Sequence, residues 1–250
     1  MKAIIITVGN EILSGRTVNT NFSFIARMLT FSGYEVIEGI IIRDDIDAIS
    51  RAFREASSSA DLVISSGGLG PTFDDITLEG FSRAFNLKMV DNEMAMKMII
   101  AKVGTITPER KKMGIIPENA EPLANNAGVA PGIFIKIAGK TYIILPGVPR
   151  EVESIMDGTI NRIRIKDFHY IDRTFELENT LESLLAPVIA KMMKTYGDRV
   201  YIKSHPKLSR EGKPWVELEI SASGKDEAAL NSLIDSVIED IQKEMIHKDY

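Results

Sequence analysis

The residues whose types and spacing are best suited to chemistry form a glycine-rich stretch from Ser65 to Asp75, SSGGLGPTFDD. Consecutive glycines after an apolar run let the backbone turn sharply with its N–H groups exposed, and a following helix would add free N–H donors and a positive dipole end. The stretch therefore predicts an anion cradle. It is neither the dinucleotide-binding G-x-G-x-x-G motif nor a Walker A loop, which carries a lysine. The alternative interpretation is a tight connection without a ligand.

Two adjacent carboxylates, Asp74 and Asp75, end this stretch. An aspartate at a helix N-terminus often caps free N–H groups. Adjacent helical positions point about 100° apart, however, so both aspartates cannot serve the same cap. A carboxylate beside a phosphate repels it unless a divalent cation lies between them, and hard oxygen ligands suit Mg²⁺ or Mn²⁺. The pair therefore favours a cation next to the cradle.

Further polar residues follow another apolar run, the first of the chain. Asn10 and Glu11 come directly after the first run, and Asn19 and Thr20 lie a few residues later. Because the carboxyl ends of parallel strands meet at one crevice, we expect Glu11 and Asp74 to face the same ligand. In the alternative interpretation this is a solvated loop in which Asn19 or Thr20 caps the next helix.

Two more segments are candidates for the same crevice. The basic segment Arg110-Lys111-Lys112 either clamps a second phosphate or forms a solvated helix face. Pro146-Gly147-Val148-Pro149 follows another apolar run, where a rigid turn either lines the crevice or starts a helix.

The apolar pattern predicts the elements that must position these residues. β-Branched runs at 3–8, 36–42 and 62–64 alternate with helical spacing at 21–31 and 45–60, which predicts an α/β fold with a three-layer, doubly wound, mostly parallel sheet. Helices are expected next at 75–85 and 93–103, then a hairpin over 132–145 and a helix over 150–163. From about residue 167 the pattern changes to a compact α+β unit, with strands at 169–177, 200–204 and 215–222, helices at 179–196 and 226–245, and a loop at 209–214. We therefore predict domains at 1–165 and 166–250.

Composition restricts the functional class. The chain of 250 residues has no cysteine, which excludes thiolate metal sites and cysteine nucleophiles. A net charge of -5 argues against nucleic acid as a partner, because a broad grip on phosphates needs a basic surface. No apolar run is long enough for a bilayer or a signal peptide, so we expect a cytoplasmic protein without a membrane partner.

Several motifs occur in one order along the chain. They are GNEIL from Gly9, VNTN from Val18, SGGLGPT from Ser66 with Asp74-Asp75, APG from Ala130 and LPGVPRE from Leu145. With this set the first 160 or so residues resemble the CinA (competence/damage-inducible) family, whose N-terminal part has a molybdopterin-binding, MoaB/MogA-like fold. The remaining segment is similar to the family's small KH-like domain, but it lacks a G-x-x-G loop, so RNA binding is not implied. The amidohydrolase domain of longer members is not expected here, because the chain ends at Tyr250.

The resemblance implies a metal-dependent pyrophosphatase that hydrolyses ADP-ribose or a related nucleotide with Mg²⁺, Mn²⁺ or Co²⁺, and a homodimer or other homo-oligomer. It also implies a role for each candidate residue. Asp74 and Asp75 would hold the cation, and Glu11 and Asp75 are the candidates for the general base. The ligand-binding candidates are Asn10, Asn19, Thr20, Gly67, Gly68, Leu69, Gly70, Thr72, Arg110, Lys111, Pro146 and Gly147. Two alternatives stay open: a molybdopterin-binding protein of molybdenum-cofactor biosynthesis, and a non-catalytic nucleotide sensor.

Overall fold

The computed structural model describes residues 1–208 and 213–246, so most of the predicted loop at 209–214 lies outside the described residues. The chain divides into two compact units. The first comprises Met1–Thr30 and Tyr34–Arg164, and the second comprises Phe31–Gly33 and the residues from Ile165 onward.

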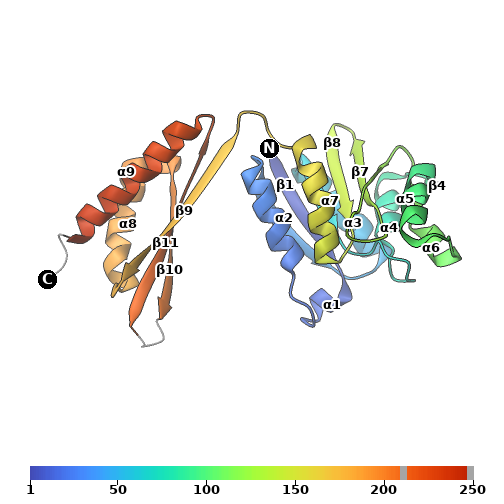
Figure 1. Cartoon of the computed structure of the whole chain (residues 1–250), viewed down its shortest axis with the longest axis horizontal. Helices are drawn as coiled ribbons and strands as arrows, with labels where there is room; N and C mark the ends of the chain where they lie inside the picture. Colours follow the sequence, from blue (N-terminus) through green and yellow to red (C-terminus); the bar gives the residue numbers. More distant parts are fainter. Residues whose placement is uncertain (209–212, 247–250) are drawn as a thin grey trace. The chain divides into compact units, whose positions relative to one another are not determined.

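The first unit is built on a six-stranded sheet with the strand order β2-β1-β3-β8-β7-β6 (Figure 1). Four neighbouring strands run parallel, and β7 and β6 extend the sheet in antiparallel register. The predicted mostly parallel α/β fold is therefore confirmed. The strands are β1 (Lys2–Val8), β2 (Glu35–Ile42), β3 (Leu62–Ser66), β6 (Glu121–Leu123), β7 (Gly132–Ile137) and β8 (Lys140–Leu145).

Helices cover both faces of this sheet. Figure 1 shows α2 (Thr20–Phe31) and α7 (Pro149–Thr159) along one face. On the other face, α3 (Ile46–Ser59) and α4 (Thr77–Phe85) pack against the alternate residues of β1. This core includes the fully buried rings of Phe53 and Phe81, whose centroids lie 4.9 Å apart. Because successive strand residues point to opposite faces, an almost continuous apolar run such as β1 can serve both layers.

Strand β2 is the edge strand of this sheet. It lies next to β1 only, and Ile37 and Ile41 are 38% and 44% exposed. Like the central strands it is rich in β-branched residues, but it also contains Glu35, Glu38 and Gly39, and charged residues are typical of an edge.

An excursion from the sheet, residues 86–118, forms a small structure of its own. The expected helix α5 (Glu93–Val103) and the basic helix α6 (Pro108–Lys112) are present. Two strands that the sequence did not predict, β4 (Met89–Asp91) and β5 (Ile115–Pro117), pair as a separate antiparallel sheet. Three residues are too few to show the alternation by which a strand is recognised.

The second unit is a three-stranded antiparallel sheet with two helices. The strand order is β10-β11-β9, and a buried cluster that includes Leu185, Leu218 and Ile234 forms its core. Its elements are β9 (His169–Glu178), α8 (Glu182–Tyr196), β10 (Tyr201–Leu208), β11 (Pro214–Gly224) and α9 (Glu227–Ile246).

Across residues 1–208 and 213–246, no helix combines the length and the apolar character needed to cross a bilayer. The cytoplasmic location and the homo-oligomer stay predictions.

Candidate functional site

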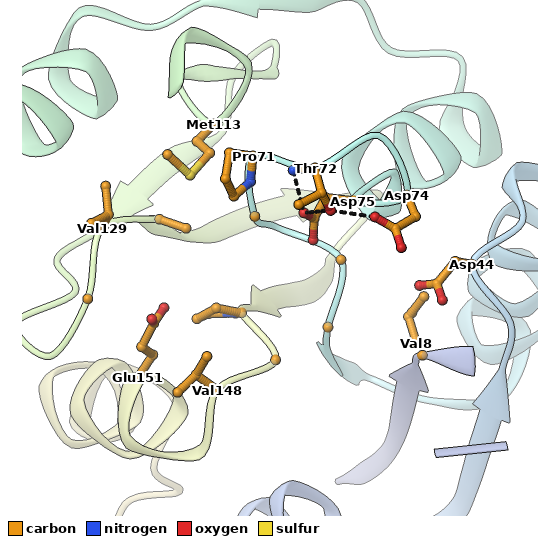
Figure 2. Close-up of a pocket in the computed structure, with 18 of the residues that line it drawn as sticks. Val8, Asp44, Pro71, Thr72, Asp74, Asp75, Met113, Val129, Val148 and Glu151 are labelled. Carbon is orange, nitrogen blue, oxygen red and sulfur yellow. Dashed lines mark hydrogen bonds between the residues drawn. The ribbon is translucent and has the colours of Figure 1, made fainter. Parts of the chain in front are cut away.

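A cavity of about 720 Å³ lies where β1, β3 and β8 end (Figure 2). Loops from three strand ends therefore meet at one place, as expected for a parallel sheet. Its walls also receive residues from the excursion at 86–118 and from the segment before β7. The lining residues are Val8, Gly9, Glu11, Asp44, Gly67, Gly68, Gly70, Pro71, Thr72, Asp74, Asp75, Val103, Arg110, Met113, Gly128, Val129, Ala130, Pro146, Gly147, Val148, Pro149 and Glu151.

The floor of the cavity depends on Gly67. This residue has a φ of +107°, and its N–H donates to the carbonyl of Leu145 at 3.0 Å. A Cβ atom at this position would lie 2.0 Å from the carbonyl oxygen of Val8. Only glycine combines this φ with so close an approach of two backbones. Gly67 therefore lets β3 leave the sheet between the ends of β1 and β8.

The start of α4 holds the loop in place. The N–H of Thr77 donates to the carbonyl of Gly68 at 3.2 Å, and the Thr77 hydroxyl donates to the carbonyl of Gly67 at 2.8 Å. The predicted helix start at Asp75 is therefore wrong, because α4 begins at Thr77 and its first N–H already has a partner. By contrast, the N–H groups of Gly68 and Gly70 make no hydrogen bond within the described part of the chain. Both residues line the cavity, so their N–H groups are candidate donors to a bound anion.

Asp74 and Asp75 precede the helix, and neither caps it, so that interpretation is also wrong. Asp75 Oδ2 accepts from the N–H and the hydroxyl of Thr72, at 2.8 and 2.6 Å, and Asp74 Oδ1 contacts the same hydroxyl (Figure 2). A hydroxyl has one proton, so it donates to only one carboxylate at a time. The Thr72 hydroxyl, the Asp74 backbone N–H and Lys112 lower the pKa of Asp74. The carboxylate of Asp74 is therefore ionised at neutral pH, and it shares one donor with Asp75.

Asp44 is a cavity residue that the sequence reasoning missed. It follows β2, and the backbone N–H of Asn10 donates to its Oδ2 at 2.9 Å. Burial raises the pKa of Asp44, and the negative charges of Glu11 and Asp74 raise it further, whereas the Asn10 hydrogen bond lowers it. Figure 2 shows Asp44 beside Asp74. The rule that placed Glu11 at a strand end would also have found Asp44.

The structure brings ten of the predicted residues to the cavity and places five elsewhere. Asn19 caps α2 by accepting from the N–H of Phe22 at 3.1 Å, and Leu69 is buried in the core. Lys111 lies outside the cavity, where its Nζ is 3.5 Å from Asp91 Oδ1. The neighbouring Arg110 lines the cavity. Those at the cavity are Glu11, Gly67, Gly68, Gly70, Thr72, Asp74, Asp75, Arg110, Pro146 and Gly147, and those that do not line it are Asn10, Asn19, Thr20, Leu69 and Lys111.

The cavity carries an excess of negative charge. Its ionisable lining residues are one guanidinium, that of Arg110, and five carboxylates, those of Glu11, Asp44, Asp74, Asp75 and Glu151. Among the residues described, however, no three acidic or histidine side chains lie close enough together to hold a metal ion. The protein therefore does not complete an ion site alone, and oxygen atoms of a ligand would have to supply the other positions.

The opposite wall combines apolar side chains with a half-buried carboxylate. Val103, Met113 and Val129 line its apolar part, and Glu151, from the first turn of α7, lies below Met113 and Val129 in Figure 2. Asn125, which is buried, donates to Glu151 Oε2 at 2.8 Å. Burial raises the pKa of Glu151, and the Asn125 hydrogen bond partly opposes that rise.

Comparison with known proteins gives a consistent family. The profile described as "Probable molybdopterin binding domain" matches residues 4–165. A protein from Caldivirga maquilingensis is 44% identical over 95% of this chain and 94% of its own, and Ta0487 from Thermoplasma acidophilum is 47% identical over 94% and 93%. A crystal structure described as the protein CinA with unknown function, from Thermoplasma acidophilum, is 50% identical with a TM-score of 0.65. It covers 66% of this chain and 100% of that one.

The close approach at Gly67 makes a prediction about stability. We expect Gly67→Ala to destabilise the fold more than Gly139→Ala. Both residues have positive φ, a strain of about 1–2 kcal/mol for alanine, but a Cβ atom at Gly139 meets nothing within 4 Å. Overlap with Val8 should cost Gly67→Ala a further 1–3 kcal/mol, roughly. Urea unfolding measures the free energy of unfolding of both variants. An equal decrease in the two would contradict the close approach at Gly67.

The half-buried Glu151 predicts a pH-dependent effect. Its raised pKa means that the folded state holds the proton more tightly, so the free energy of unfolding falls as pH rises through that pKa. Glutamine carries no charge, so Glu151→Gln should melt at a higher temperature than wild type at neutral pH. The difference should shrink as the pH falls from the raised pKa towards 4.5, the ordinary value, and should be absent below it. Glu153→Gln, an exposed position on the same helix, is the control and should show no such trend.

Proposed function

This chain belongs to the family of probable molybdopterin binding domains, and we propose on that premise that its cavity binds a phosphorylated pterin. The observation that carries the proposal is the placing of free backbone donors and an apolar wall in one cavity. A phosphate meets the N–H groups of Gly68 and Gly70, and Arg110 supplies a guanidinium at the same cavity. Guanidinium–phosphate hydrogen bonds are charge-assisted and therefore strong.

The rest of the cavity suits a flat ring. Val103, Met113 and Val129 offer apolar contacts, and the volume of about 720 Å³ falls in the range of small-molecule sites. Pocket walls of this kind, with a few convergent polar groups, are typical of sites that bind a ring and fix its orientation. A ring on the apolar wall with its phosphate at the glycines therefore uses both parts of the cavity.

The neighbouring cations of α6 test this assignment. We expect wild type to bind a pterin monophosphate more tightly than the same pterin without phosphate, measured by the change in pterin fluorescence. Arg110→Ala should weaken the phosphate-bearing ligand roughly tenfold to a hundredfold, the value of one charge-assisted hydrogen bond. Lys111→Ala is the matched control and should leave the affinity unchanged, because Lys111 faces Asp91. Equal losses in the two variants would show that only general electrostatic attraction operates.

A second candidate is metal-dependent hydrolysis of the diphosphate linkage of ADP-ribose or a related nucleotide, which the excess of carboxylates favours. A diphosphate in this cavity is repelled by Glu11, Asp44 and Asp74 unless a cation offsets their charge. Mg²⁺, Mn²⁺ or Co²⁺ held by the phosphates together with Asp44 and Asp74 would stabilise the charge that develops during attack on phosphorus. Asp75 has a different part, because its Oδ2 accepts two hydrogen bonds that shape the loop. Glu11 then stays as the candidate general base. This is the activity that the resemblance to the CinA family implies.

Hydrolysis has a direct test. Protein incubated with ADP-ribose and each of the three cations should release AMP, and Asp74→Asn should abolish the release. Asp91→Asn, which alters an exposed carboxylate outside the cavity, is the control and should retain it. Tight ligand binding without AMP under any cation would reject the hydrolase and favour a nucleotide sensor.

A further inference from the structure

The cavity contains one carboxylate that neither the phosphate-binding loop nor the acidic group around Asp74 uses. Glu151 lies on the far wall, across the cavity from Asp74 and Asp75 in Figure 2. Among the described residues no cation pairs with this half-buried glutamate, which is therefore costly to keep ionised. The hydrogen bonds around the carboxylate show what holds it in place.

The side-chain amide of Asn125 positions this carboxylate. Asn125 Nδ2 donates to Glu151 Oε2 and to the carbonyl of Ala130, both at 2.8 Å, and Asn125 Oδ1 accepts from the N–H of Ala127 at 3.1 Å. Asn125 is 6% exposed, so neither its position nor its orientation is free to change. The buried amide therefore fixes one oxygen of Glu151 by its hydrogen bond.

The other oxygen has no such partner. Glu151 Oε1 makes no hydrogen bond within residues 1–208 and 213–246. A Cβ atom at Gly128, another lining residue, would lie 2.2 Å from it, so the glycine leaves the space that this oxygen occupies. A carboxylate oxygen has two acceptor positions, so Oε2 also keeps one for a ligand. Glu151 thus presents two fixed acceptors and no donor.

We propose that Glu151 determines ligand specificity by accepting two adjacent N–H groups from the edge of a ring, as in the 2-amino-4-oxopyrimidine edge of a pterin. This inference rests on the proposed binding of a phosphorylated pterin and adds the part of the ring that is recognised. The apolar residues Val103, Met113 and Val129 also line the cavity, where they would contact the ring faces, and Figure 2 shows Met113 and Val129 on the same side as Glu151. A ring edge that presents an oxygen in place of the amino group would face a carboxylate oxygen and be repelled.

A pair of ligands separates ring recognition from phosphate binding. Pterin and lumazine derivatives that carry the same side-chain phosphate differ at the ring edge, because lumazine has an oxygen where pterin has the 2-amino group. Titration by calorimetry should show wild type preferring the pterin about tenfold to a hundredfold, the effect of one hydrogen bond to a charged group. In Glu151→Gln, whose amide places a donor towards the ring, the two affinities should become nearly equal. Glu153→Gln should keep the wild-type ratio.

Each outcome decides between the proposals. If wild type binds the phosphorylated pterin and the phosphorylated lumazine equally well, the proposed ring recognition by Glu151 is wrong, while the proposed phosphate binding stands. If neither of these two ligands binds, the proposed function is wrong, and the inference about Glu151 is wrong with it. If Glu151→Gln weakens both ligands by the same factor, Glu151 has only a structural part, and its specificity role is rejected. The wild-type comparison needs no variant, so it is decisive even if Glu151→Gln does not fold.

Discussion

The meeting of three backbones at Gly67 is the constraint on which the first unit depends. The strand ends of β1 and β8 approach this residue from both sides, through the carbonyls of Val8 and Leu145. Only a residue without a side chain fits between these two carbonyls. Gly67 therefore allows the chain to leave the sheet directly after β3. The Thr77 hydroxyl then closes on the Gly67 carbonyl, which sets where α4 begins and leaves the intervening residues facing the cavity.

Most of the sheet was predictable because it depends on local patterns. Apolar runs separated by helical spacing identified β1, β3 and the hairpin of β7 and β8, and each central strand needs that pattern to serve two layers. The start of α4 was misplaced for a physical reason: Thr72 and Asp75 bond to each other, and such local bonds compete with helix formation. Propensity alone does not show which of these two alternatives is lower in free energy.

The cavity was only partly predictable, because its members come from distant segments. Residues at strand ends, such as Glu11 and Gly147, follow from the topology of a parallel sheet. Which of two adjacent cations faces the cavity depends on the rotation of a five-residue helix, and so Arg110 and Lys111 were not distinguished. The pairing of Asn125 with Glu151 depends on a turn through Gly128, and no local pattern marks it.

The excursion at 86–118 contributes Val103, Arg110 and Met113 to the cavity, yet it pairs only with itself through β4 and β5. Its backbone adds no strand to the six-stranded sheet. Ile99, Met113 and Ile116 of this segment are buried in the core that β1 and β3 share. Changes of length elsewhere in the segment can therefore accumulate during evolution without disturbing the register of β1, β3 and β8. Descendants of one ancestral scaffold can in this way diverge in the size of the molecule they accept while the floor beneath it is inherited unchanged.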